Sequence, residues 1–199
     1  MCSWCWGFAP VAEALITQAQ AAGVDVHLVM GGLRTASVAL DPSTRRYILE
    51  HWQAVHAATG QPFLFEGALP EGFVYDTEPA CRAVVAARNL DPASAWPLAR
   101  LIQHAFYAQG RDVTRAPVLV ELAEAAGLPR IEFAEAFDSA EQQIATAADF
   151  SWVQDLGIAG FPTLLAERNG QLALLTNGYQ PLDELAPLLG RWLERAAYA

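Results

Sequence analysis

A long block of helix-like sequence, residues 41–156, separates two short segments that have the character of β-structure. The first segment, residues 24–30 (VDVHLVM), is rich in β-branched residues and almost continuously hydrophobic, which predicts a central strand buried on both faces. The second, residues 162–175, holds two apolar runs around Asn169-Gly170, a dipeptide typical of tight β-hairpins. This order predicts a small mixed sheet with a helical block inserted in its middle.

Apolar spacing, prolines and capping residues divide the rest of the chain into helices. A helix over 6–22, kinked at Pro10 and ended by Gly23, precedes the first β-segment, and an amphipathic helix over 182–197 closes the chain. Within the block we expect helices at about 42–59, 77–90, 91–106, 117–126, 129–137 and 139–156.

Composition argues against several classes of protein. The 199 residues are 53% hydrophobic and 17% charged, which is enough for a packed core and unlike a disordered chain. The formal net charge of −10 would repel a polyanion, so nucleic acid is not an expected partner. No apolar run reaches the ~18 residues that a membrane span needs, and no basic-then-apolar secretory leader is present. We therefore expect a soluble, cytoplasmic protein.

The strongest chemical signal is the pair Cys2-x-x-Cys5 at the start of the first helix. Side chains three residues apart share one helix face, and a small adjustment brings them within disulfide distance. Cys2 would lie where free backbone N–H groups and the helix dipole favour an anion, which lowers its pKa and supplies a nucleophilic thiolate. Cys5, one turn further, is suited to resolve a mixed disulfide. The pair therefore predicts thiol–disulfide exchange.

A CxxC motif alone also fits half of a zinc site, or two buried structural cysteines. A zinc site needs two further ligands, and the remaining candidates, Cys81 and the four histidines, form no second tight pair. Three cysteines are too few, and odd in number, for a structural disulfide framework. We therefore favour redox chemistry and expect neither a metal nor another cofactor.

The second signal is Gly160-Phe161-Pro162-Thr163, directly before the hairpin. A proline at the start of a strand removes one ladder donor. A cis Phe161–Pro162 bond would turn the Phe161 backbone outward, where it could pair with an extended substrate beside the cysteines. A trans proline that ends a loop is the alternative, and the accompanying CxxC motif favours the first reading. Phe161, Pro162 and Thr163, together with Trp4 between the cysteines, are the candidate substrate-binding residues.

The sequence CSWCWGF at 2–8, the sequence GIAGFPT at 157–163 and the helical block between them resemble the DsbA-like thiol–disulfide oxidoreductases. The likeness is closest to the cytoplasmic, FrnE-like branch and spans almost the whole chain. It implies an α/β, thioredoxin-like fold with a large all-helical insertion. The thioredoxin-like domain would comprise 1–33 and 151–199, and the insertion 34–150.

The same resemblance implies Cys2 as the nucleophile, Cys5 as the resolving thiol and Pro162 as a cis-proline. Substrates would be proteins or small molecules that contain thiols or disulfides. A homodimer is a further possibility. The family has a β-strand directly before its CxxC motif, whereas this sequence starts at Met1. We therefore expect either a sheet that lacks its first strand or a strand encoded upstream of Met1.

Two other functions remain open from the sequence. A glutathione-dependent transferase or isomerase of the kappa type resembles the same fold, although such sites typically do not keep both cysteines. A redox-inactive binding module would result if a missing strand left Cys2 unsupported. Among the other residues, we expect Cys81 to be a small buried hydrophobe, His27 a core histidine, and Arg82 and Arg88 solvated.

Overall fold

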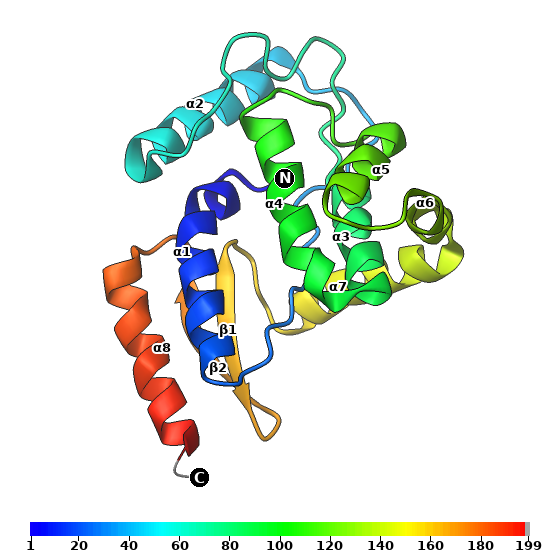
Figure 1. Cartoon of the computed structure of the whole chain (residues 1–199). Coiled ribbons are helices and arrows are strands. Elements are labelled where there is room, and N and C mark those ends of the chain that lie inside the picture. Colours follow the sequence, from blue (N-terminus) through cyan, green and yellow to red (C-terminus); the bar gives the residue numbers. More distant parts are fainter. Residues whose placement is uncertain (198–199) are drawn as a thin grey trace.

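The computed structural model describes residues 1–197 and is mostly helical, with one small hairpin (Figure 1). In the view of Figure 1, α1, α8 and the hairpin form one group, and α2 to α7 form a second group beside it. The elements in chain order are α1 (Ser3–Ala21), α2 (Pro42–Thr59), α3 (Glu78–Leu90), a 3₁₀ helix (Pro92–Ser94), α4 (Ala95–Tyr107), α5 (Ala116–Ala125), α6 (Arg130–Asp138), α7 (Ala140–Asp155), β1 (Thr163–Arg168), β2 (Gln171–Asn177) and α8 (Leu182–Ala197).

The helices begin and end where capping chemistry places their boundaries. At the start of α2, the Asp41 carboxylate accepts hydrogen bonds from the backbone N–H groups of Ser43 and Thr44. The same helix ends at Gly60, whose φ of 71° is a left-handed conformation that glycine adopts without strain. Ser139 caps α7 by accepting the N–H of Gln142. The predicted helices are confirmed to within a few residues.

The predicted hairpin is also confirmed. Strand β1 pairs antiparallel with β2, and the two residues between the strands, Asn169 and Gly170, have φ values of 52° and 77°. Two left-handed residues give a turn whose twist matches that of the flanking strands, which is why the Asn-Gly dipeptide favours it.

The predicted strand at 24–30 is wrong. This segment joins no sheet, and β1 and β2 form the two-stranded sheet of the described residues. A strand needs a neighbour that pairs with its backbone, whereas the segment and β1 here line a cavity of about 490 Å³. His27 is exposed, and Val26 is 43% exposed, so the prediction of a core histidine is wrong as well.

Two charged side chains replace part of the missing strand pairing. Arg88 on α3 donates a 2.7 Å hydrogen bond to the carbonyl of Leu28, and Asp149 on α7 accepts the N–H of Met30 at 2.8 Å. The two side chains also form a salt bridge of 2.9 Å, and each is only 12% exposed. The expectation that Arg88 is solvated is therefore wrong, because its guanidinium is used inside the protein. Arg82 is likewise mostly buried, at 14% exposure.

Helix α1 takes part in both hydrophobic cores. The larger core lies among the helices α2 to α6 and includes Trp52, Leu98 and, from α1, Trp6. The smaller core joins α1 to α8 through side chains that include Phe8 and Leu185. The N-terminal helix is therefore fixed from two sides.

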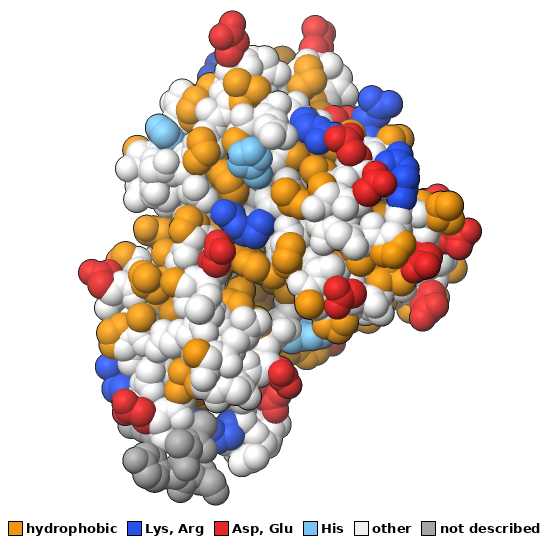
Figure 2. Space-filling model, in the orientation of Figure 1, with side chains coloured by type: hydrophobic (Ala, Val, Ile, Leu, Met, Phe, Trp, Pro, Cys, Tyr) orange, Lys and Arg blue, Asp and Glu red, His pale blue; other side chains and the backbone are white. Residues whose placement is uncertain are grey.

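The visible surface carries no continuous basic patch. Figure 2 shows acidic side chains spread over this face, with basic side chains scattered or beside acidic ones. Within residues 1–197, no helix is both long enough and apolar enough to cross a bilayer.

Replacing Asp149 by Ala should lower the free energy of unfolding by about 3–5 kcal/mol, because it leaves the Arg88 guanidinium buried without its partner. Denaturant unfolding followed by circular dichroism measures the change. Glu124→Ala is the matched control, since the Arg130–Glu124 pair is more than half exposed and should contribute less than about 1 kcal/mol. Equal losses in the two variants would show that the buried pair does not hold the segment.

Candidate active site

Cys2 occupies the N-cap position of α1. Its backbone is extended, with φ −116° and ψ 119°, and its sulfur accepts the N–H of Cys5 at 3.2 Å. Its carbonyl accepts the N–H of Trp6 at 3.1 Å and so begins the helix. The first-turn N–H groups of a helix lack partners within the helix and carry its positive partial charge. A sulfur at this position is therefore stabilised as an anion.

The surroundings of the two thiols give them opposite properties. The hydrogen bond from the Cys5 thiol lowers the pKa of Cys2 most, and the backbone N–H of Cys5 and the positively charged N-terminus lower it further, despite its burial. The same thiol–thiol hydrogen bond, together with burial and the charge on Cys2, raises the pKa of Cys5. Both cysteines are free and half-buried. Cys2 is therefore the thiol of the pair that loses its proton more easily, and Cys5 is the one that keeps it.

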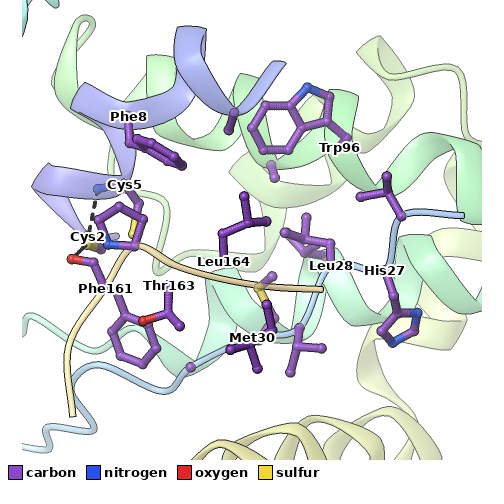
Figure 3. Close-up of a pocket in the computed structure, with 18 of the residues that line it drawn as sticks. Cys2, Cys5, Phe8, His27, Leu28, Met30, Trp96, Phe161, Thr163 and Leu164 are labelled. Atoms are coloured by element: carbon purple, nitrogen blue, oxygen red, sulfur yellow. Dashed lines mark hydrogen bonds between the residues drawn. The ribbon is translucent and has the colours of Figure 1, made fainter. Parts of the chain in front are cut away.

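The GFPT sequence lies directly against Cys2, although the two are 159 residues apart in the chain. The Cys2 sulfur is 3.7 Å from the carbonyl oxygen of Phe161, as the dashed line in Figure 3 shows. The Phe161–Pro162 peptide bond is cis. The Thr163 hydroxyl donates to the carbonyl of Gly160 at 2.8 Å, which ties the start of β1 to the preceding loop. The structure thus brings the two sequence motifs together at one site.

Gly31 makes room for the ring of Phe161. A Cβ atom at Gly31 would lie only 2.1 Å from Cζ of that ring, so a larger residue would displace it. A close approach between segments 130 residues apart leaves no local signal, which is why this role was missed.

Two tryptophans flank the cysteines and have different surroundings. Trp6 is 2% exposed, and its indole N–H donates to the carbonyl of Pro62 at 3.0 Å, so it is a core residue. Trp4 is half-buried, and its indole N–H donates to His51 Nε2 at 3.0 Å. Its ring lies 5.9 Å from that of Tyr179, in the loop after β2. Neither the contact with His51 nor that with Tyr179 was predicted, because both join segments that are distant in the sequence.

Two buried tyrosines support the residue before Cys2. The Tyr75 hydroxyl donates to the Met1 carbonyl at 3.0 Å and lies 3.4 Å from the Tyr107 hydroxyl. Burial raises the pKa of both phenols, so they remain neutral donors at pH 7. They therefore hold the backbone just ahead of the N-cap.

The cysteines lie at one end of the 490 Å³ cavity, whose walls come mainly from α1, residues 24–33 and β1. Figure 3 shows Phe8, Leu164, Leu28 and Met30 along it, with His27 at the opposite end from Cys2. Its lining is mostly apolar.

Cys81 also lines this cavity, and its buried position confirms the prediction made for it. Burial raises the pKa of the Cys81 thiol, so it is protonated at neutral pH. Among residues 1–197, no group of three or more His, Cys, Asp or Glu side chains is arranged to hold a metal ion.

The sequence profile described as a DSBA-like thioredoxin domain matches residues 1–190. The chain belongs to this DSBA-like family. The structure is similar to that of a candidate protein disulfide isomerase from Nitrosomonas europaea, with 45% identity and a TM-score of 0.91 over 98% of this chain and 94% of that one. It is also similar to the cytosolic disulfide reductase DsbM from Pseudomonas aeruginosa, with 35% identity and a TM-score of 0.80 over 96% and 94%.

A structure of the Pseudomonas reductase with GSH gives 32% identity and a TM-score of 0.77, over 96% of this chain and 95% of that one. A comparison with curated protein sequences finds no significant match. The family and these structures confirm the predicted DsbA-like thioredoxin fold. They also place this DSBA-like chain among the thiol–disulfide oxidoreductases in general.

Iodoacetamide should modify Cys2 before the other two thiols, because only the thiolate reacts and only Cys2 has a lowered pKa. The alkylation rate should rise with pH, and the pH at which it is half-maximal, which reports the pKa of Cys2, should lie below the pKa of ~8.5 typical of a free cysteine. Mass mapping of peptides after brief treatment at pH 7 identifies the modified residue. The denatured protein is the control, in which all three cysteines should react alike. Equally fast modification of Cys5 or Cys81 in the folded protein would contradict the assignment.

Proposed function

We propose that this chain catalyses thiol–disulfide exchange with Cys2 as the nucleophile and Cys5 as the resolving thiol. The observation that carries the proposal is the position of the Cys2 sulfur. It lies at the N-terminus of α1, 3.2 Å from the Cys5 N–H and 3.7 Å from the Phe161 carbonyl. The DSBA-like family and the reductase relatives support this chemistry.

In the reducing direction, the Cys2 thiolate attacks one sulfur of a substrate disulfide, and the other sulfur leaves and takes up a proton. Cys2 is then neutral in a mixed disulfide, so its charge no longer raises the pKa of Cys5. The Cys5 thiol loses its proton more easily and attacks the Cys2 sulfur. The substrate leaves as a dithiol that has gained two electrons and two protons, and Cys2–Cys5 becomes a disulfide. Oxidation of a substrate is the reverse of these steps.

The residues beside Cys2 suggest how a substrate is held. We propose that the backbone N–H and carbonyl groups of Phe161 form hydrogen bonds with an extended substrate segment, as in strand addition. Pro162 and Thr163 shape the start of β1 at this point, and Trp4, between the two cysteines, offers an apolar surface.

Both proteins and small thiols fit this proposal as substrates. The similar structure of the Pseudomonas reductase with GSH supports a small thiol as one substrate or as the source of electrons. That relative is named as cytosolic, which supports a cytoplasmic location for this chain. The chemistry uses only the two sulfurs and needs no further cofactor.

Replacing Cys2 by Ser should abolish insulin reduction, because serine is not a nucleophile toward disulfides at neutral pH. Cys5→Ser should instead accumulate a mixed disulfide through Cys2, because the resolving thiol is gone. Turbidity of reduced insulin measures the first result, and non-reducing electrophoresis with mass spectrometry measures the second.

Cys81→Ser is the matched control for both variants, since Cys81 is buried and protonated. It should retain at least half of the parent activity. Full activity in Cys2→Ser, or a mixed disulfide that forms through Cys81, would rule out the proposed roles.

A further inference from the structure

The side chain between the two cysteines is held by parts of the chain that are far away in sequence. The Trp4 indole N–H donates to His51 on α2, at a distance of 3.0 Å. On its other side the indole lies 5.9 Å from Tyr179, and Tyr179 in turn contacts Phe8 of α1, with 6.4 Å between ring centroids. Trp4 is only half-buried, so its position is fixed by these contacts and not by complete burial in a core.

His51 is itself fixed in a defined state. The ring of Tyr47, one turn earlier on α2, stacks on the imidazole at 5.8 Å with an angle of 28° between the planes. An indole N–H can only donate, so His51 Nε2 must accept and carries no proton. This bond assigns the neutral tautomer with its proton on Nδ1.

The contact joins the helical block to the redox pair. Helix α2 belongs to the group of helices around the larger core, whereas Trp4 lies in the first turn of α1 between Cys2 and Cys5. The orientation of Trp4 is therefore set by a residue 47 positions further along the chain.

We propose that His51 is a positioning residue that holds Trp4 as an apolar docking surface for polypeptide substrates beside Cys2. The proposal rests on the proposed redox function and specifies which substrates use this surface. With its N–H bonded to His51, the indole has no polar group left to offer, so the part that faces a substrate is apolar. It therefore suits a polypeptide with an apolar side chain next to its reacting cysteine.

Two substitutions at His51 separate hydrogen bonding from ring packing. His51→Phe keeps an aromatic ring against Tyr47 but removes the acceptor, whereas His51→Gln keeps an acceptor oxygen. With insulin as substrate, His51→Phe should raise KM about fivefold, or ~1 kcal/mol at 1.4 kcal/mol per tenfold, with kcat within about twofold of the parent. His51→Gln should restore KM to within about twofold of the parent.

A small disulfide that does not reach Trp4 is the second substrate to be compared with insulin. The rate with 5,5′-dithiobis(2-nitrobenzoic acid) should be unchanged in both His51 variants. His56→Phe is the matched control on the same helix, because His56 bonds to the Gln61 carbonyl at 2.7 Å and makes no hydrogen bond to Trp4. Its KM for insulin should equal that of the parent.

The Trp4 indole proton gives a readout that does not depend on turnover. In ¹⁵N–¹H spectra, with the signal assigned by Trp4→Phe, solvent exchange of this proton should accelerate in His51→Phe and remain slow in His51→Gln. Unchanged exchange and unchanged KM in His51→Phe would overturn the proposal, as would equal effects of the Phe and Gln variants. A parent protein without any turnover would instead refute the redox function and the docking role with it, even where the exchange data confirmed the contact.

Discussion

The sulfur of Cys2 performs two tasks at one position, since it caps α1 and is the proposed nucleophile. Helix caps are usually oxygen atoms of Ser, Thr, Asp or Asn, which accept first-turn N–H groups. A thiol is a weak acceptor, and it becomes a strong one when it ionises. The demand of the helix for a cap and the demand of the reaction for a thiolate therefore act in the same direction. Cys5, Trp4 and the contact with Phe161 all take their positions from this first turn.

A first helical turn is rigid only if the rest of its helix is fixed. Trp6 anchors α1 in the larger core and Phe8 anchors it in the smaller one. Tyr75 holds the backbone on the other side of the cap through the Met1 carbonyl. The cap is thus supported before, within and after the turn, although its own bond is a single contact of 3.2 Å between the Cys5 N–H and sulfur.

Local chemistry made much of the fold and the redox pair predictable. Asn169-Gly170 determines its turn by backbone preference alone, and Cys2 and Cys5 lie on one helix turn whatever surrounds them. The predictions failed where the outcome depends on a distant neighbour. Residues 24–30 have the composition of a strand but no partner to pair with, and Arg88 has the appearance of a surface residue until Asp149 is placed beside it. No local pattern could reveal such contacts.

Residues 24–30 form no strand, but they still determine the geometry of the site. Their backbone is held by Arg88 and Asp149 instead of a ladder, and these bonds fix the path of the chain into Gly31. The absence of a side chain at Gly31 lets the Phe161 ring lie against the backbone, and the carbonyl of Phe161 then faces the Cys2 sulfur. The cavity lies beside this chain of contacts and does not interrupt it. The two sulfurs and the Phe–Pro loop therefore keep their relative positions, although the sheet of the described residues has only two strands.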